Sequence, residues 1–183
     1  MSRALFVDPG VTCPGVAIFN LDTKRLFAAR YFSGRGFHED VGLVLELALE
    51  VADWARPHGP YSIIGSEWPQ IYRAGFNPNR MLPMALFLGA LTAFLNDSVD
   101  VGCTYTLLTP SKWKGQVKKK VTARAALDAF KPGELDAVDQ AVEFLRDLAW
   151  AEERPNRDLR HATNNTMDAV AFGMFLLGRM ETQ

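Results

Sequence analysis

Cysteine, long hydrophobic runs and an excess of charge of either sign are all scarce in this sequence. The two cysteines, Cys13 and Cys103, cannot build a disulfide framework, and no Cys-x-x-Cys pair indicates a zinc site. So few thiols favour a reducing, intracellular setting. The longest uncharged apolar stretch covers residues 81–95 and is shorter than the ~20 residues that span a bilayer, so it indicates a buried helix.

The overall composition is that of an ordinary globular protein. Apolar residues make up 48% of the chain and charged residues 22%, which argues against disorder, collagen or a coiled coil along its whole length. The formal charge of −1 excludes a protein that is basic throughout. Because the 183 residues contain no internal repeat and no Pro/Ser-rich linker, we expect a single domain over residues 1–183.

The hydrophobic pattern predicts a mixture of strands and helices. Short apolar runs bounded by turn residues predict strands over residues 4–7, 15–19, 26–32, 61–65 and 101–108. Apolar residues at helical spacing predict helices over residues 41–54, 81–95, 121–130, 135–150 and 166–180. The tight turns between the first three strands favour an antiparallel arrangement, and the later strands alternate with helices. This order predicts an α/β fold with a mixed five-stranded sheet flanked by helices.

Acidic residues stand at positions where the pattern predicts burial. Asp8 directly follows a buried strand, Glu67 ends another, and Asp168 lies within an otherwise apolar helix. A buried unpaired carboxylate is costly, so each needs a partner. Asp8 could simply cap its own Asp-Pro-Gly turn. Asn165 lies three residues before Asp168 on the same helix face. Together these oxygen ligands predict a site for Mg²⁺ or Mn²⁺.

A strongly basic segment balances the acidic remainder of the chain. It carries a charge of +6 with no acid, which leaves −7 elsewhere, and its basic residues are Lys112, Lys114, Lys118, Lys119, Lys120 and Arg124. Taken alone, such a run is often a solvated helix face. Beside a metal site for phosphate chemistry, contact with a nucleic-acid backbone is the better interpretation, and binding should then weaken with salt.

Aromatic and basic residues follow Glu67 in a polar loop. Trp68 and Tyr72 are candidates for stacking on unpaired bases. We favour Tyr72 for this role, because Trp side chains are buried on average and Trp68 is expected to pack against the sheet edge. Arg73 and Arg80 are candidates for phosphate contacts.

Several blocks of sequence resemble RuvC-type Holliday-junction resolvases of the RNase H-like superfamily. Residues 5–10 resemble the first strand of that family, and residues 63–67 resemble the strand that carries its second acid. Residues 165–171 resemble its closing helix, and residues 110–115 resemble a segment of phage-type relatives. The blocks occur in the family's order and span almost the whole chain.

The resemblance implies an RNase H-like fold and a set of metal ligands. Asp8, Glu67 and Asp168 match the ligand positions of the family. Asn165 falls at the fourth position, where the family commonly has Asp or His. An amide can donate its carbonyl oxygen but carries no charge, and His161 lies near enough in sequence to compensate.

The resemblance also implies an activity and its partners. The expected protein is a homodimeric nuclease that resolves four-way DNA junctions by paired symmetric nicks and leaves 5′-phosphates. Two Mg²⁺ or Mn²⁺ ions, ~4 Å apart, would straddle the scissile phosphate. One lysine among residues 118–120 is expected close to that phosphate. The expected location is the cytoplasm of a bacterial or phage-infected cell, with no membrane and no organic cofactor.

Other functions fit parts of the same pattern. Residues 8–12 also resemble the phosphate hairpin of actin-like sugar kinases, but the chain is too short for two lobes and has no second glycine-rich loop. A related RNase H-like nuclease could act on other branched DNA or on RNA–DNA hybrids. A module that binds junctions with weak catalysis is a further alternative, because Asn165 is uncharged.

Overall fold

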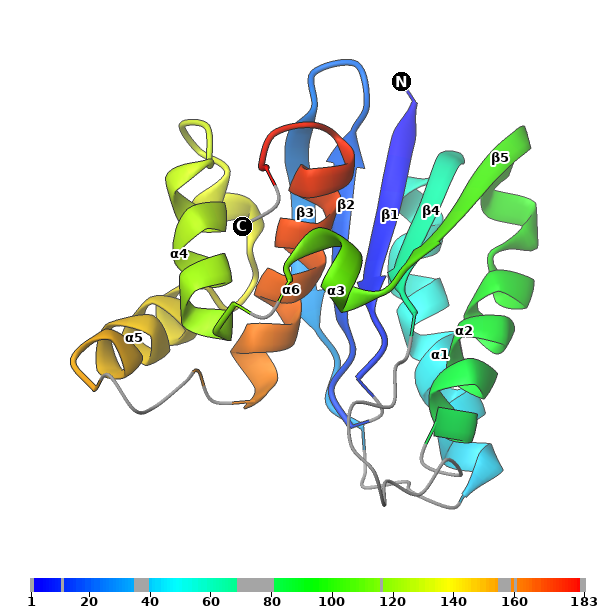
Figure 1. Cartoon of the computed structure of the whole chain (residues 1–183). Coiled ribbons are helices and arrows are strands. Elements are labelled where there is room, and N and C mark those ends of the chain that lie inside the picture. The colour runs from blue at the N-terminus through cyan, green and yellow to red at the C-terminus, as the bar shows by residue number, and fades with distance from the viewer. Residues whose placement is uncertain are drawn as a thin grey trace.

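A computed structural model describes residues 2–10, 12–34, 40–68, 81–115, 117–154, 159 and 161–181, without the side chains of 161–163. Five strands form one mixed sheet in the order β3-β2-β1-β4-β5 (Figure 1). The strands are β1 (Arg3–Asp8), β2 (Gly15–Asn20), β3 (Arg25–Tyr31), β4 (Tyr61–Glu67) and β5 (Val99–Leu108). The first three are antiparallel, whereas β4 and β5 run parallel to β1, so the predicted mixed sheet is confirmed.

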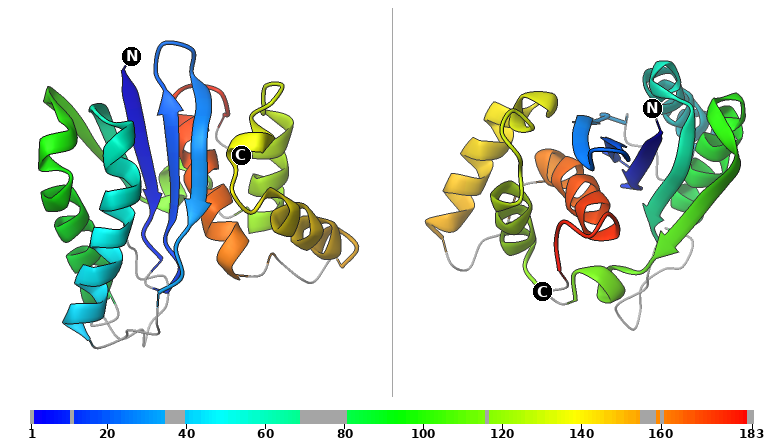
Figure 2. Two further views of the ribbon diagram at one scale, coloured as in Figure 1. Left: turned by 180° about the vertical axis from the view of Figure 1, so that it is seen from behind. Right: turned by 90° about the horizontal axis from the view of Figure 1, so that it is seen from above.

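Helices cover both faces of this sheet. They are α1 (Val41–Ala55), α2 (Leu82–Phe94), α3 (Pro110–Trp113), α4 (Lys119–Asp128), α5 (Ala141–Glu152) and α6 (His161–Leu176). The pair α1 and α2 lies on one face, and α6 lies on the other with α4 and α5 outside it (Figure 2). No described helix is long and apolar enough to cross a membrane.

The alternation of side chains along β1 explains the two-layered core. Leu5 and Val7 are fully buried among residues of α1 and α2, whereas Ala4 and Phe6 are fully buried against α6. Successive residues of a strand point to opposite faces, so a strand covered on both sides is apolar throughout. The uninterrupted apolar run of residues 4–7 is therefore typical of this central position.

Close packing holds α6 against the sheet. The ring of Phe6 makes edge-to-face contacts with Phe19 and with Phe172 of α6. At Gly173, an added Cβ would lie 2.6 Å from both the Phe6 and the Phe19 ring. The absence of a side chain at this position allows the helix backbone to approach the sheet, and this approach fixes the position of the polar residues on the first half of α6.

The single helix predicted over residues 135–150 is wrong. A short 3₁₀ helix, η4 (Leu135–Ala137), is followed by an extended Val138 and only then by α5. Val138 forms a parallel bridge with Ala29 of β3, and the Asp139 N–H donates to the Ala29 carbonyl. These bonds to the edge of the sheet interrupt the helix, and local periodicity does not reveal them.

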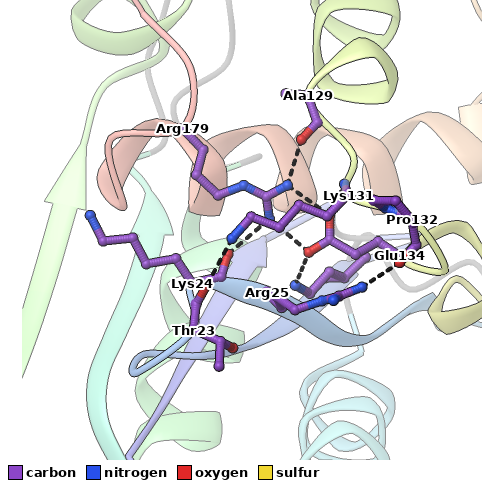
Figure 3. Close-up of polar contacts among 9 residues, drawn as sticks. Thr23, Lys24, Arg25, Ala129, Lys131, Pro132, Glu134 and Arg179 are labelled. Carbon is purple, nitrogen blue, oxygen red and sulfur yellow. Dashed lines mark hydrogen bonds and ion pairs between the residues drawn. The ribbon is translucent and has the colours of Figure 1, made fainter.

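A buried ion pair anchors the segment that precedes this interruption (Figure 3). Arg179 contacts Glu134 at 2.7 Å, and their side chains are only 8% and 1% exposed. Glu134 also accepts the backbone N–H groups of Leu26 and Lys131, each at 2.6 Å. The pair thus ties the loop after α4 to the start of β3 and to the chain that follows α6.

Candidate active site

Three acidic side chains from three separate elements lie together at one end of the sheet. Asp8 is the last residue of β1, and Glu67 is the last residue of β4. These strands are parallel neighbours that pair up to Val7 and Ser66, so their carboxyl ends meet at the same edge. Asp168, on the buried face of α6, interacts electrostatically with both. The structure therefore brings together the three acids singled out from the sequence.

This crowding changes the acidity of the group. Burial raises the pKa of Asp8 well above its usual value, and repulsion by Glu67 and Asp168 raises it further. Burial also raises the pKa of Glu67, in spite of the lysine beside it. Glu67 is 9% exposed and Asp168 only 2%. The three carboxylates therefore repel one another unless a cation compensates their negative charge.

Lys114 supplies part of that compensation. Its Nζ lies 2.8 Å from Oε1 of Glu67 and 3.3 Å from Oδ2 of Asp168, so it bridges the two. Burial alone would lower the pKa of Lys114, but the surrounding acids raise it above the ordinary value. Lys119 adds a second ammonium group, with Nζ 3.2 Å from Oδ2 of Asp168.

Trp113 positions Glu67 from the other side. Its indole Nε1 donates a hydrogen bond of 2.9 Å to Oε1 of Glu67. The Trp113 side chain is buried and packs against Phe172 and Phe175 of α6. Sequence reasoning assigned no role to Trp113. Its position as a large apolar residue between Lys112 and Lys114 could have indicated that it is buried, with one side of that short helix facing the core.

The two neighbouring asparagines of α6 have different contacts. Asn164 is 2% exposed, and its Nδ2 lies 3.3 Å from Oδ2 of Asp168. Its Oδ1 is buried without a hydrogen-bond partner among the described residues. Asn165, the residue singled out from the sequence, instead donates its Nδ2 to the backbone carbonyl of Cys13. Of the two asparagines, Asn164 and not Asn165 therefore contacts Asp168.

Glycines allow the turn after β1 to press against this part of α6. An added Cβ at Gly15 would lie 1.9 Å from the carbonyl oxygen of Asn165. A Cβ at Gly10 would lie 2.6 Å from Nδ2 of the same residue. Since Gly10 follows Asp8 by two residues, this close approach of backbone to helix also sets the position of Asp8 relative to Asp168.

The donor set fits a hard divalent cation in its chemistry. Carboxylates and an amide oxygen are the ligands that Mg²⁺ and Mn²⁺ prefer, and the orphaned Oδ1 of Asn164 is a buried acceptor beside them. Within the described residues, no three His, Cys, Asp or Glu side chains are arranged to hold one ion. The Lys114 ammonium group bridges Glu67 and Asp168, so binding of a cation between these two acids requires Lys114 to move.

The structure divides the basic segment into distinct groups. Lys114 and Lys119 face the acids. Lys120 donates to the carbonyls of Ala151 and Arg154, and Arg124 forms a two-pronged contact with Glu152, at 2.8 and 2.7 Å. The side chains that connect α4 to α5 thus use two of the six charges. Lys112 and Lys118 are exposed.

Some of the predicted DNA-binding residues lie outside the described residues. These are Tyr72, Arg73 and Arg80, and the side chain of His161 is likewise not described. Trp68 is described and is 52% exposed, with its backbone N–H bonded to the Leu108 carbonyl at 2.8 Å. Its backbone therefore extends the pairing with β5, while its side chain reaches the surface.

Three solved structures share this fold across nearly the whole chain. A yeast mitochondrial Holliday junction resolvase matches with a TM-score of 0.55 at 13% identity, covering 97% of this chain and 80% of the other. A fowlpox virus Holliday junction resolvase matches with 0.51 at 12% identity, covering 97% and 99%. A manganese-soaked human cytomegalovirus terminase nuclease domain matches with 0.50 at 11% identity, covering 96% and 82%.

These likenesses establish the fold as RNase H-like, as the resemblance in sequence predicted. No protein-family model matches the sequence, and no curated protein matches it. At identities of 11–13% the solved structures show the fold alone.

Proposed function

We propose that this protein is a divalent-metal-dependent DNA endonuclease that resolves four-way junctions by paired symmetric nicks and leaves 5′-phosphates. The convergence of Asp8, Glu67 and Asp168 at the carboxyl edge of the sheet carries this proposal. The fold supports it further, because the yeast mitochondrial and fowlpox virus proteins that share it are described as Holliday junction resolvases.

Each residue of the site has a distinct task in the proposed reaction. Asp8, Glu67 and Asp168 would hold the cation, and Trp113 keeps Glu67 oriented through its indole N–H. When bound, Mg²⁺ or Mn²⁺ would lower the pKa of an attacking water and stabilise the departing oxygen. Lys112 and Lys118 are exposed and flank Lys114 in sequence, and their ammonium groups are proposed to neutralise DNA phosphates.

A cleavage assay on a panel of substrates tests the proposed specificity. The wild-type protein with Mg²⁺ or Mn²⁺ is expected to nick a four-way junction at opposed positions, and ligase should seal the nicks because they carry 5′-phosphates. Linear duplex should be cut at least about 10-fold more slowly, because it cannot place two phosphates in two related sites. Equal cutting of duplex would contradict junction specificity.

A second candidate is an RNase H-like nuclease for other branched DNA or for RNA–DNA hybrids. The match to a terminase nuclease domain favours this alternative, because that protein has the same fold but is not described as a junction resolvase. A flap and a hybrid in the same panel decide between the two. A third possibility, a junction-binding module with weak catalysis, predicts a mobility shift without nicks in every divalent metal.

We further propose that the active form is a homodimer assembled through α2 and β5. Helix α2 contains no charged residue, yet only Phe87 and Leu91 are buried. Leu82 remains 65% exposed beside an apolar groove of about 590 Å³, which Tyr105 and Leu107 of the edge strand also line. A helix that is apolar on every side is normally covered on every side. A second copy suits this face because a two-fold dimer matches a two-fold junction.

A further inference from the structure

The first half of α6 presents two asparagines whose amides are engaged in different ways. Asn165 donates its Nδ2 to the Cys13 carbonyl and lies so close to the turn that a Cβ at Gly10 would sit 2.6 Å from that nitrogen. Asn165 therefore joins the turn after β1 to the helix. Its amide is occupied by a backbone group outside the acidic cluster.

Asn164 has the opposite character. It is 2% exposed and lies one helical turn before Asp168, at the i and i+4 spacing that places two side chains on one face. Its Nδ2 is 3.3 Å from Oδ2 of Asp168, so the amide is directed into the cluster. Its Oδ1 has no partner among the described residues, although buried acceptors are normally satisfied.

We propose that Asn164, rather than Asn165, is the amide ligand of the divalent cation and shares it with Asp168. This inference rests on the metal dependence of the proposed function. An unsatisfied buried oxygen beside a carboxylate is the donor pair that a hard cation recruits. The oxygen and nitrogen of an amide are nearly equivalent in shape, so they can exchange places without a change in the backbone.

Charge at the cluster supports this assignment. Oδ2 of Asp168 accepts from Asn164 and is also within 3.3 Å of both Lys114 and Lys119. Three donors thus converge on one oxygen, so positive charge is concentrated at Asp168. A cation held there would displace these donors, and the amide would then present its oxygen.

Binding of Mn²⁺ to the protein alone, measured by calorimetry without DNA, tests the assignment. Asn164→Asp keeps the shape of the side chain and adds a charged ligand, so it should tighten Mn²⁺ binding by about 10-fold. Asn164→Leu removes the oxygen and should weaken binding by about 10-fold. The matched controls Asn165→Asp and Asn165→Leu should bind Mn²⁺ within about 3-fold of wild type, because that amide faces Cys13.

Thermal melts in chelator and in Mn²⁺ give a second reading that does not depend on activity. Asn164→Asp should melt below wild type in chelator, because it crowds another carboxylate against Asp168, and Mn²⁺ should raise its melting temperature by more than it raises that of wild type. Unchanged Mn²⁺ affinity and melting response in both Asn164 variants would overturn the assignment. Tighter binding in Asn165→Asp alone would return the role to Asn165.

Cleavage of a four-way junction by wild type, run in parallel, separates this inference from the proposed function. If wild type cuts the junction while the Asn164 variants bind Mn²⁺ unchanged, the ligand assignment fails alone. If the Asn164 variants shift Mn²⁺ affinity while wild type cuts no junction in any metal, the proposed function fails and the assignment stands. A wild-type protein that binds no Mn²⁺ contradicts both.

Discussion

At the scale of single residues, the stability of the candidate site depends on how the negative charges of its acids are balanced. Asp8, Glu67 and Asp168 lie close enough to repel one another, and the Lys114 ammonium holds two of them together. A buried charge without a partner is expensive, so either this lysine or a metal ion must be present. Replacing one of these residues should therefore raise or lower the free energy of unfolding, depending on whether a negative or a positive charge is removed.

Asp8→Asn is expected to stabilise the protein in the absence of divalent metal. The pKa of Asp8 is raised in the folded state, so its ionisation near neutral pH opposes folding. Removal of that charge should increase the free energy of unfolding by about 1 kcal/mol. Urea denaturation in chelator measures the change. Asp97→Asn, an exposed acid far along the chain, should leave stability unaltered, and a destabilised Asp8→Asn protein would show that the acids do not repel.

Lys114→Met is expected to have the opposite effect. It leaves Glu67 and Asp168 without their bridging cation and should lower the free energy of unfolding in chelator by about 2 kcal/mol. Mn²⁺ should then raise the melting temperature of the variant by more than that of wild type, because no lysine competes for the acids.

Lys112→Met provides the control for that change. Lys112 lies two residues away on the same short segment and is exposed, so its replacement should alter stability by less than about 0.5 kcal/mol. A Lys114→Met protein that is as stable as wild type in chelator, or that responds no more strongly to Mn²⁺, would contradict the bridging role.

Glu134→Gln tests the ion pair on the far side of the fold. Burial alone would raise the pKa of Glu134, but hydrogen bonds from Arg179 and from two backbone N–H groups hold it below its usual value. The pair therefore stabilises the fold at neutral pH, and this contribution is lost as the pH falls through the lowered pKa. We expect a loss of about 3 kcal/mol at neutral pH that shrinks in acid.

Denaturation of wild type and Glu134→Gln at neutral and acidic pH measures this difference. Asp53→Asn breaks an exposed pair with Arg56 and should cost no more than about 0.5 kcal/mol at either pH. A Glu134→Gln deficit that stays constant from neutral pH into acid would show that the carboxylate charge is not responsible.

At the scale of elements, the fit of α6 against the sheet decides where the site lies. Gly15 at the start of β2 is the tightest point, because a Cβ there would lie 1.9 Å from the Asn165 carbonyl oxygen. Gly15→Ala should therefore destabilise the protein by about 2 kcal/mol or more. Gly89→Ala is the matched control, since nothing lies within 4 Å of its added Cβ and alanine favours a helix by up to about 1 kcal/mol.

Chemical denaturation of the two glycine variants measures both effects. The variants differ in what surrounds the new methyl group, so opposite signs would show that close contact, and not glycine itself, governs the α6 packing. A Gly15→Ala protein as stable as wild type would mean that α6 can shift without cost, and the geometry around Asp8 and Asp168 would then not be fixed.

Local patterns predicted the elements that depend on local sequence. The five strands and the helix over residues 41–54 follow from apolar runs and spacing, and the acids at the ends of β1 and β4 stood out because charge follows a buried strand there. The helix predicted over residues 135–150 is wrong because Val138 pairs with β3, a partner more than a hundred residues away. Pairing between residues so far apart in sequence cannot be predicted from local periodicity.

Which asparagine and which lysine contact the acids could not be predicted from the sequence, for a similar reason. Asn164 and Asn165 are equally plausible neighbours of Asp168 on a helix, at four and three residues. The choice depends on the rotation of α6, which the contact of Phe172 with Phe6 fixes. In the same way, nothing in a run of lysines indicates that Lys114 faces inward while Lys112 is exposed; the contacts of Lys114 with Glu67 and Asp168 show this only in the folded chain.

At the scale of the whole molecule, the near-neutral charge of −1 is the sum of a basic segment and an acidic remainder, and the basic residues make different kinds of contact. Two lysines of the basic segment compensate the acids of the site, and Lys120 and Arg124 tie α4 to α5. At least four of the six basic side chains therefore contact acids or carbonyls of the same chain. The sequence indicated one cationic strip for DNA, and the structure assigns much of that charge to internal contacts.

The proposed dimer predicts the effect of a charge on its apolar face. Leu82→Glu should convert the protein from dimer to monomer, because it places a carboxylate in the groove between α2 and β5. Sedimentation or light scattering measures the mass directly. Val142→Glu is the matched control: Val142 is 72% exposed but lies on α5. A wild-type monomer, or a Val142→Glu monomer beside a Leu82→Glu dimer, would contradict the proposed face.

Nicking of a four-way junction by wild type and Asp168→Asn tests the central claim most directly. Asp168 is 2% exposed and contacts two lysines, so it lies at the centre of the proposed site. In Mn²⁺ the wild type should produce two opposed nicks, and Asp168→Asn should lose at least about 100-fold in rate while still binding the junction. Asp97→Asn should cut as wild type does. Undiminished nicking by Asp168→Asn would contradict the account.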